Sequence, residues 1–79
     1  MARIINVSGD ETKLEDLSPD ALQKAVGGDI EVIKLPDRVQ MLINEEGRKL
    51  GLPVNSTATL LCGRKVCGDV VLLNKEDLP

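Results

Sequence analysis

The side chains that could do chemistry in this sequence are two cysteines and several pairs of neighbouring carboxylates. Histidine is absent, which removes the commonest general acid–base group and the commonest metal ligand together. The serines, Ser8, Ser18 and Ser56, all occur in turn or helix-cap contexts. Without histidine, neither a Ser–His nor a Cys–His nucleophile pair can be built. We therefore expect no catalytic residues and predict that the protein is not an enzyme.

Cys62 and Cys67 are separated by residues 63–66. The pair could be a redox couple or disulfide across a hairpin, half of a four-cysteine zinc site shared by two copies, or two free thiols in a reducing compartment. A lone pair lacks the other two ligands of a zinc site. We predict free thiols, no metal and no cofactor.

Carboxylates are adjacent at Glu15-Asp16, Glu45-Glu46 and Glu76-Asp77, each in a predicted loop or tail. Two carboxyl groups work as an acid–base pair only when their environments drive the two pKa values apart. Neighbouring carboxylates in turns are solvated, so these pairs predict no catalytic site.

Basic residues also fall at predicted turns, as Arg38, Arg48-Lys49 and Arg64-Lys65, in a chain whose net charge is −3. A protein that grips duplex DNA usually carries a basic stripe. The sequence contains no aromatic residue on which single-stranded bases could stack. We therefore do not expect nucleic acid as a partner.

The length of 79 residues predicts a single domain, residues 1–79, with a thin core of aliphatic side chains and two methionines. No apolar run approaches the roughly 18 residues that span a bilayer, and the start MARIIN lacks the pattern of a signal peptide. We expect a cytoplasmic protein with no membrane partner.

The first elements are a strand over residues 3–7, a connecting loop over residues 11–16, and a helix. Ser18 is suited to cap that helix, Pro19 to begin it, and Gly27-Gly28 to end it. We predict that Leu22 and Val26 pack against Val32, Met41 and Ile43.

Residues 30–53 are the centre of the sequence. Two apolar runs, Ile30–Leu35 and Val39–Ile43, flank the turn residues Pro36-Asp37-Arg38 and predict a hairpin. In the second run, Val39, Met41 and Ile43 alternate with Gln40, Leu42 and Asn44. This alternation predicts a strand with one buried face. A turn at Asn44-Glu45-Glu46-Gly47, with Gly47 left-handed, predicts a third meander strand through Leu50 and Leu52.

The remaining elements are a helical turn over Ser56–Leu61 capped by Asn55, an interior strand over Asp69–Asn74, and a frayed tail over residues 75–79. An irregular strand is the alternative over residues 56–61, because Thr57 and Thr59 favour one. The predicted fold class is α+β: a β-α-β-β-β antiparallel sheet with one main helix on one face and a short helical turn before the last strand.

Polar residues that bound the central meander are the candidates for binding a partner, because recognition is often carried by loops on a rigid scaffold. They are Asn44, Glu45, Glu46 and Asn55. All of these residue types are also common in turns and caps, so a purely local role is the alternative.

The stretches LQKAVGGDIEVI (residues 22–33), MLINEEGRKLGLPVN (41–55) and GDVVL (68–72) resemble a family of small proteins of unassigned function. The family is common in bacteriophages, plasmids and other mobile elements of bacteria and archaea, and it shares the pattern Leu-Gln-x-x-Val-Gly-Gly, Asn-Glu-Glu-Gly and Leu-Pro-x-Asn. This chain departs from it around the last loop, where residues 62–67 replace hydrophobic and often aromatic residues. The resemblance implies an origin in a mobile element and carries no catalytic assignment.

These features together predict a non-catalytic accessory protein of a phage or mobile element that acts by binding a host protein. The alternative is a sponge for a small molecule or nucleotide signal. A basic groove between protomers of a homo-oligomer would favour the sponge, and a flat acidic face would favour the protein-binding role.

Overall fold

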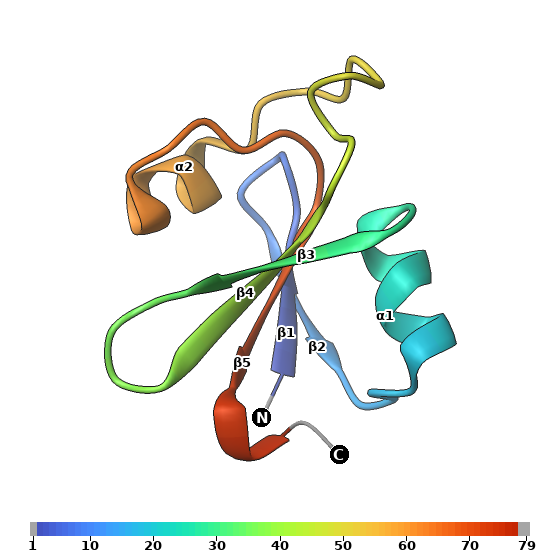
Figure 1. Cartoon of the computed structure of the whole chain (residues 1–79), viewed down its shortest axis with the longest axis vertical. Helices are drawn as coiled ribbons and strands as arrows, with labels where there is room; N and C mark the ends of the chain where they lie inside the picture. Colours follow the sequence, from blue (N-terminus) through green and yellow to red (C-terminus); the bar gives the residue numbers. More distant parts are fainter. Residues whose placement is uncertain (1, 78–79) are drawn as a thin grey trace.

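The computed structural model describes residues 2–77 and consists of one antiparallel sheet with a helix on each side of it (Figure 1). The predicted α+β class is confirmed. The elements are β1 (Ala2–Ile5), β2 (Glu11–Leu14), α1 (Pro19–Val26), β3 (Ile30–Lys34), β4 (Val39–Asn44), α2 (Ser56–Cys62), β5 (Val70–Asn74) and a 3₁₀ turn, η1 (Lys75–Asp77).

The last strand occupies the centre of the sheet. The strand order is β2-β1-β5-β4-β3, and every neighbouring pair is antiparallel. Residues 70–73 are all buried, because β5 has a strand on either side and a helical layer on either face. The prediction of an interior strand near the C-terminus is confirmed.

The charged segment after the first strand is itself a strand, so the predicted loop over residues 11–16 is wrong. The first strand ends at Ile5, and a turn at Gly9 (φ 93°) returns the chain. Residues 11–14 then pair with β1 in the register Ala2↔Leu14 to Ile5↔Glu11. This edge strand is held by backbone pairing and by an ion pair between Arg3 and Glu11 (3.0 Å). A strand held in this way has no alternation of apolar residues by which the sequence could predict it.

Helix α1 begins and ends where the sequence predicts. The Ser18 hydroxyl accepts a hydrogen bond from the Ala21 N–H (3.3 Å), and Pro19 is the first helical residue. Gly27 is left-handed (φ 84°), and its N–H donates to the Gln23 carbonyl (2.8 Å). A helix of this length needs a partner to persist, and the sheet provides it.

The face of the sheet that α1 covers differs from the prediction. Leu22 and Val26 are buried, but Met41 and Ile43 belong to the opposite face, and Val32 is 47% exposed. The prediction assumed that one face of β4 is exposed, whereas both faces of β4 are buried. The buried side chains packed with Leu22 and Val26 are Ala2, Leu42, Val71 and Leu73.

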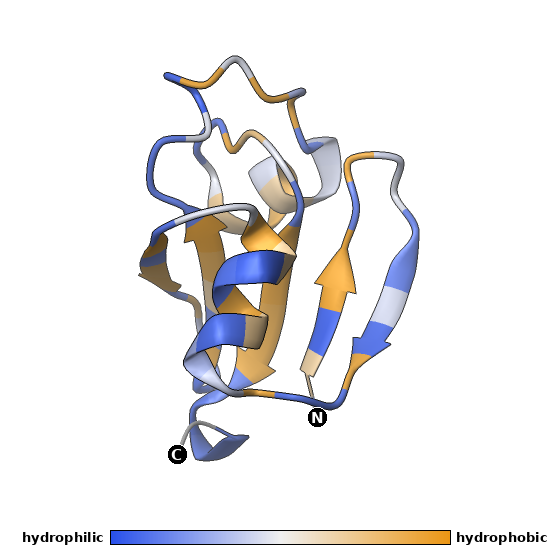
Figure 2. Ribbon diagram, turned by 90° about the vertical axis from the view of Figure 1, so that its right-hand side faces the viewer, coloured by the Kyte–Doolittle hydropathy of each residue, from blue (hydrophilic) through white to orange (hydrophobic). Residues whose placement is uncertain are grey.

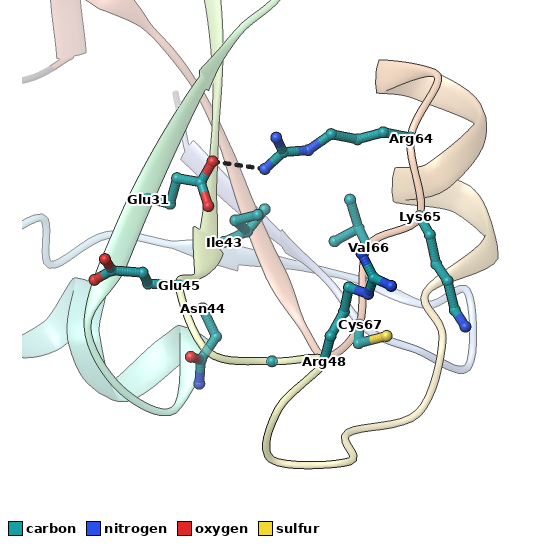
Figure 3. Close-up of a pocket in the computed structure, with 10 residues that line it drawn as sticks. Glu31, Ile43, Asn44, Glu45, Arg48, Arg64, Lys65, Val66 and Cys67 are labelled. Carbon is teal, nitrogen blue, oxygen red and sulfur yellow. Dashed lines mark hydrogen bonds and ion pairs between the residues drawn. The ribbon is translucent and has the colours of Figure 1, made fainter.

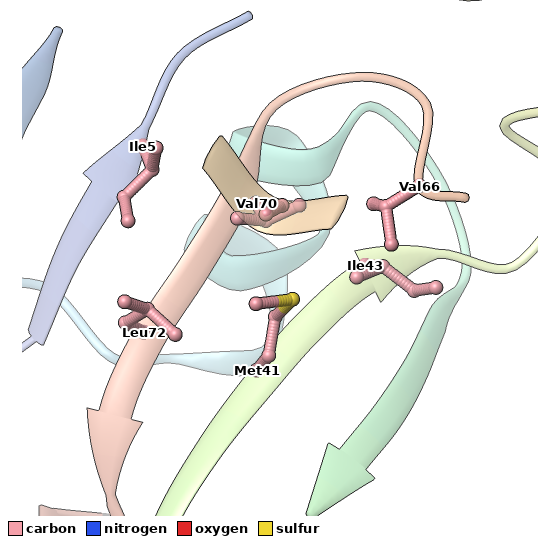
Figure 4. Close-up of a cluster of buried hydrophobic side chains, with 7 residues drawn as sticks. Ile5, Met41, Ile43, Val66, Val70 and Leu72 are labelled. Atoms are coloured by element: carbon pink, nitrogen blue, oxygen red, sulfur yellow. The ribbon is translucent and has the colours of Figure 1, made fainter. Parts of the chain in front are cut away.

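The opposite face is covered by α2 and the segment that follows it. The predicted helical turn is confirmed and extends to Cys62, with Ala58 facing the sheet. Figure 4 shows this second cluster between β1, β5, β4 and the chain at Val66. Its buried members are Ile5, Met41, Ile43, Ala58, Val66, Val70 and Leu72.

The hairpin of β3 and β4 is confirmed, but the third meander strand is not formed. Asp37 and Arg38 both have positive φ (63° and 62°) in the tight turn that joins β3 to β4. After Asn44 the chain makes successive turns through residue 51 instead of extending. The hairpin turn also contacts the C-terminal segment, because Arg38 forms an ion pair with Glu76 of η1 (2.9 Å). Residues 78–79 of the predicted frayed tail lie outside the described residues.

Candidate binding surface

The segment of residues 45–54 projects at one end of the sheet, at the top of Figure 1. It is ordered by its own backbone, since Leu50 N–H donates to the Glu46 carbonyl (2.8 Å) and Leu52 N–H to the Gly47 carbonyl (3.0 Å). A hydrogen bond from Gly68 N–H to the Pro53 carbonyl (2.7 Å) ties its end to the body. We call residues 45–54 the projecting loop.

Gly47 is required in this loop for a reason other than the predicted one. Gly47 is not among the glycines with positive φ. Instead, a Cβ at Gly47 would lie 2.6 Å from the carbonyl oxygen of Cys67. The glycine permits close approach of two backbone segments, so the predicted left-handed conformation at Gly47 is wrong.

Asn44, predicted as a binding residue, faces inward. It is buried, and its Nδ2 donates to the Val26 carbonyl (3.2 Å) at the end of α1. Its Oδ1 accepts from the Glu46 N–H (2.8 Å). The side chain therefore joins α1 to the start of the projecting loop.

Asn55, the second predicted asparagine, is fully buried. Its Oδ1 accepts from the Ala58 N–H (3.0 Å), which confirms the predicted cap of α2. Its Nδ2 donates to the carbonyls of Ile5 (2.9 Å) and Gly68 (3.0 Å). One amide thus joins β1, α2 and the turn before β5.

Glu45 and Glu46, the other two predicted residues, are exposed on the projecting loop. Glu46 lies 3.7 Å from Lys49 across one turn. Of the four predicted residues, these two are accessible to a partner, whereas the two asparagines use their side chains inside the fold. A binding role for the four stays a prediction.

Beside the loop is a hollow of about 310 Å³, which we call the charged hollow (Figure 3). Ile43 and Val66, both buried, form its floor. Glu31 and Glu45 stand on the side of the β3–β4 hairpin, and Arg48 and Arg64 on the other two sides. The remaining lining residues are Asn44, Gly47, Lys65 and Cys67.

One ion pair crosses the charged hollow. The Arg64 guanidinium extends from the end of α2 to the Glu31 carboxylate on β3 (2.6 Å), and both side chains are partly exposed. Within residues 2–77, no carboxylate lies at ion-pair distance from Arg48 or Lys65. The lining carries three basic side chains, Arg48, Arg64 and Lys65, and two acidic ones, Glu31 and Glu45, so its net charge is +1 in a protein of net charge −3.

A second, shallower hollow of about 650 Å³ adjoins the first and shares Glu45, Arg48, Lys65 and Cys67 with it. Leu52 and Val54 of the projecting loop line this second hollow, and Leu50 beside them is 60% exposed. In Figure 2 the loop alternates between hydrophobic and hydrophilic residues.

The sequence predicts the turn at residues 44–47 but continues it as a strand, and it does not bring together the residues around the projecting loop. The sequence places the two basic pairs, Arg48-Lys49 and Arg64-Lys65, at separate turns, whereas the fold brings them to one end of the sheet. Leu50 was assigned to a strand. The repetition of an Arg–Lys pair beside glycine, at Gly47 and at Gly63, was the available signal.

Both cysteines are free: Cys62 donates to the Arg64 carbonyl (3.4 Å), and Cys67 is buried. Among residues 2–77, no cluster of three or more potential ligands is arranged to hold a metal ion. The same residues contain no helix long and apolar enough to cross a membrane.

These features define a small α+β domain whose antiparallel sheet is covered on both faces and carries a charged hollow at one end. The chain belongs to the family described as a domain of unknown function, DUF3846, whose model matches residues 1–77. No curated protein and no solved structure matches the chain. The resemblance to an uncharacterised family is confirmed, and the association with phages and plasmids stays a prediction.

Proposed function

We propose that this protein is a non-catalytic accessory protein of a phage or mobile element that acts in the cytoplasm by binding a host protein through its projecting loop. The observation that carries the proposal is the exposure of Leu50 and Val54 on a loop rimmed by charged side chains. Apolar contacts surrounded by a polar rim are the usual composition of a protein–protein interface.

The rigidity of the loop supports the same proposal. Its internal backbone hydrogen bonds and the inward-facing Asn44 hold Glu45, Glu46 and Leu50 in place before any partner arrives. A preformed loop loses little conformational entropy on association, so more of the contact energy appears as affinity.

The experiment is a pull-down from host-cell lysate in which the wild type is compared with Glu45→Lys/Glu46→Lys. The matched control is Glu15→Lys/Asp20→Lys, two exposed acids near the start of α1 and outside the projecting loop, which changes the net charge equally. We expect a partner that the control retains and the loop variant loses. Equal recovery of the partner with both variants would exclude the loop acids from the interface.

A second function, a sponge for a small molecule or nucleotide signal, is favoured by the charged hollow. Its volume of about 310 Å³ lies at the lower end of the range for ligand pockets. Arg48 and Lys65 supply charge that could neutralise a phosphate. Small-molecule binding requires no host protein, so it can be measured with the purified protein alone. Such an assay separates this proposal from the protein-binding one.

A further inference from the structure

We propose that the charged hollow binds a nucleoside phosphate, with Arg48 and Arg64 contacting the phosphate and Glu31 acting as the internal anion that the ligand displaces. The inference rests on the second function proposed above, small-molecule binding, and names its site, ligand class and built-in competitor.

The anion specificity follows from the two guanidinium groups. Figure 3 shows the side chains of Arg48 and Arg64 on either side of Val66, bordering the same hollow. Guanidinium groups form bidentate, charge-assisted hydrogen bonds with phosphate oxygens. Lys65 adds a third positive charge at the rim.

The contact between Glu31 and Arg64 indicates where an anion can bind in the hollow. Their 2.6 Å separation shows that an oxyanion is already bound to one of the two guanidinium groups. Both side chains are partly exposed, so the pair can separate at little cost. A phosphate can replace the carboxylate on Arg64, and the exposed side chain of Arg48, which borders the same hollow, can turn toward it.

The size and apolar floor of the hollow favour a ligand in which the phosphate is attached to a larger organic group. A volume of about 310 Å³ greatly exceeds that of an inorganic phosphate ion, and the floor of Ile43 and Val66 offers apolar contact. Glu45 borders the hollow, but its side chain points away from Arg48 and Arg64 in Figure 3 and is not counted as a ligand contact. A nucleoside phosphate carries both features, a phosphate group and a larger body with an apolar face.

The test is isothermal titration of the full chain with adenosine 5′-monophosphate, guanosine 5′-monophosphate and cyclic AMP, with inorganic phosphate and adenosine as partial probes. We expect at least one nucleotide to bind more tightly than either partial probe. Arg48→Gln/Arg64→Gln should weaken binding about tenfold or more, because the variant loses both charge-assisted contacts to the phosphate; tenfold corresponds to about 1.4 kcal/mol. Lys13→Gln/Lys24→Gln, distant from the hollow, is the control of equal charge.

Glu31→Gln is the sharper test because the two roles of Glu31 predict different nucleotide affinities. If Glu31 competes with the ligand, its removal tightens nucleotide binding; if the ion pair is purely structural, its removal does not. We expect Glu31→Gln to tighten nucleotide binding severalfold by releasing Arg64. Circular dichroism of each variant confirms that it is folded. Nucleotide binding that Arg48→Gln/Arg64→Gln leaves unchanged overturns the site while the small-molecule function survives. Failure of every phosphate-bearing probe to bind overturns the nucleoside-phosphate inference, and it leaves the protein-binding function untouched.

Discussion

Replacement of Asn55 by alanine should remove a large part of the stability of this domain. Asn55 makes three hydrogen bonds from a fully buried position, to Ala58 N–H and to the carbonyls of Ile5 and Gly68. Each buried group left without a partner costs about 1–3 kcal/mol, and losing a helix cap alone costs about 1 kcal/mol. We expect a loss of about 3–5 kcal/mol, against a total of roughly 4–12 kcal/mol for a chain of 79 residues.

The assay is urea unfolding followed by far-ultraviolet circular dichroism, because the chain has no aromatic residue to report by fluorescence. With an m-value of about 1 kcal/mol per molar urea, the midpoint should fall by about 3 M or more. Asn55→Asp should not rescue it, because a carboxylate restores the cap but cannot donate to Ile5 and Gly68. If Asn55→Ala unfolds within about 1 kcal/mol of the wild type, the structural role assigned to this amide is wrong.

Three further predictions concern stability. Gly47→Ala should destabilise the domain by about 1–3 kcal/mol in the same assay, because its Cβ would lie 2.6 Å from the Cys67 carbonyl oxygen; an unchanged midpoint would contradict that close approach. Leu22→Ala should lose about 2–4 kcal/mol as a core truncation, and an unchanged melting curve would contradict the packing of α1. The hydrogen bond from Ser18 N–H holds the pKa of Asp16 below its usual range. Because the folded-state pKa is the lower one, this stabilisation is present above the unfolded pKa and is lost as pH falls through the folded value. Asp16→Asn should therefore flatten the acid limb of the stability–pH curve, and an unaltered limb would contradict it.

The elements that the sequence predicts correctly are those with local chemical signals. The Ser18 cap, Pro19 and Gly27 define α1, and Asn55 defines the start of α2, because capping depends on residues within one turn. Strand β2 could not be predicted this way. Two of its four residues are charged and three are exposed, and it exists because β1 offers a free edge to pair with.

The packing of α1 and the composition of the site could not be predicted, because both depend on contacts between residues far apart in the sequence. Which face of β4 meets α1 follows from β5 lying at the centre of the sheet, and strand order leaves no local trace in the sequence. The same is true of the hollow, since Glu31 and Arg64 are distant in the chain and meet only through the fold. Asn44 and Asn55 were predicted to bind a partner, but burial gives their side chains structural partners; the predicted cap at Asn55 is confirmed.

The most direct test of the proposed binding surface is quantitative capture from host-cell lysate with Leu50→Asp and Leu60→Asp compared side by side. Both leucines are exposed, Leu50 on the projecting loop (60%) and Leu60 on α2 (85%), so neither change should affect the fold. The account predicts that one host protein is recovered with the wild type and Leu60→Asp and is lost with Leu50→Asp. Recovery of that protein with Leu50→Asp and its loss with Leu60→Asp would place the interface on α2 and contradict the account.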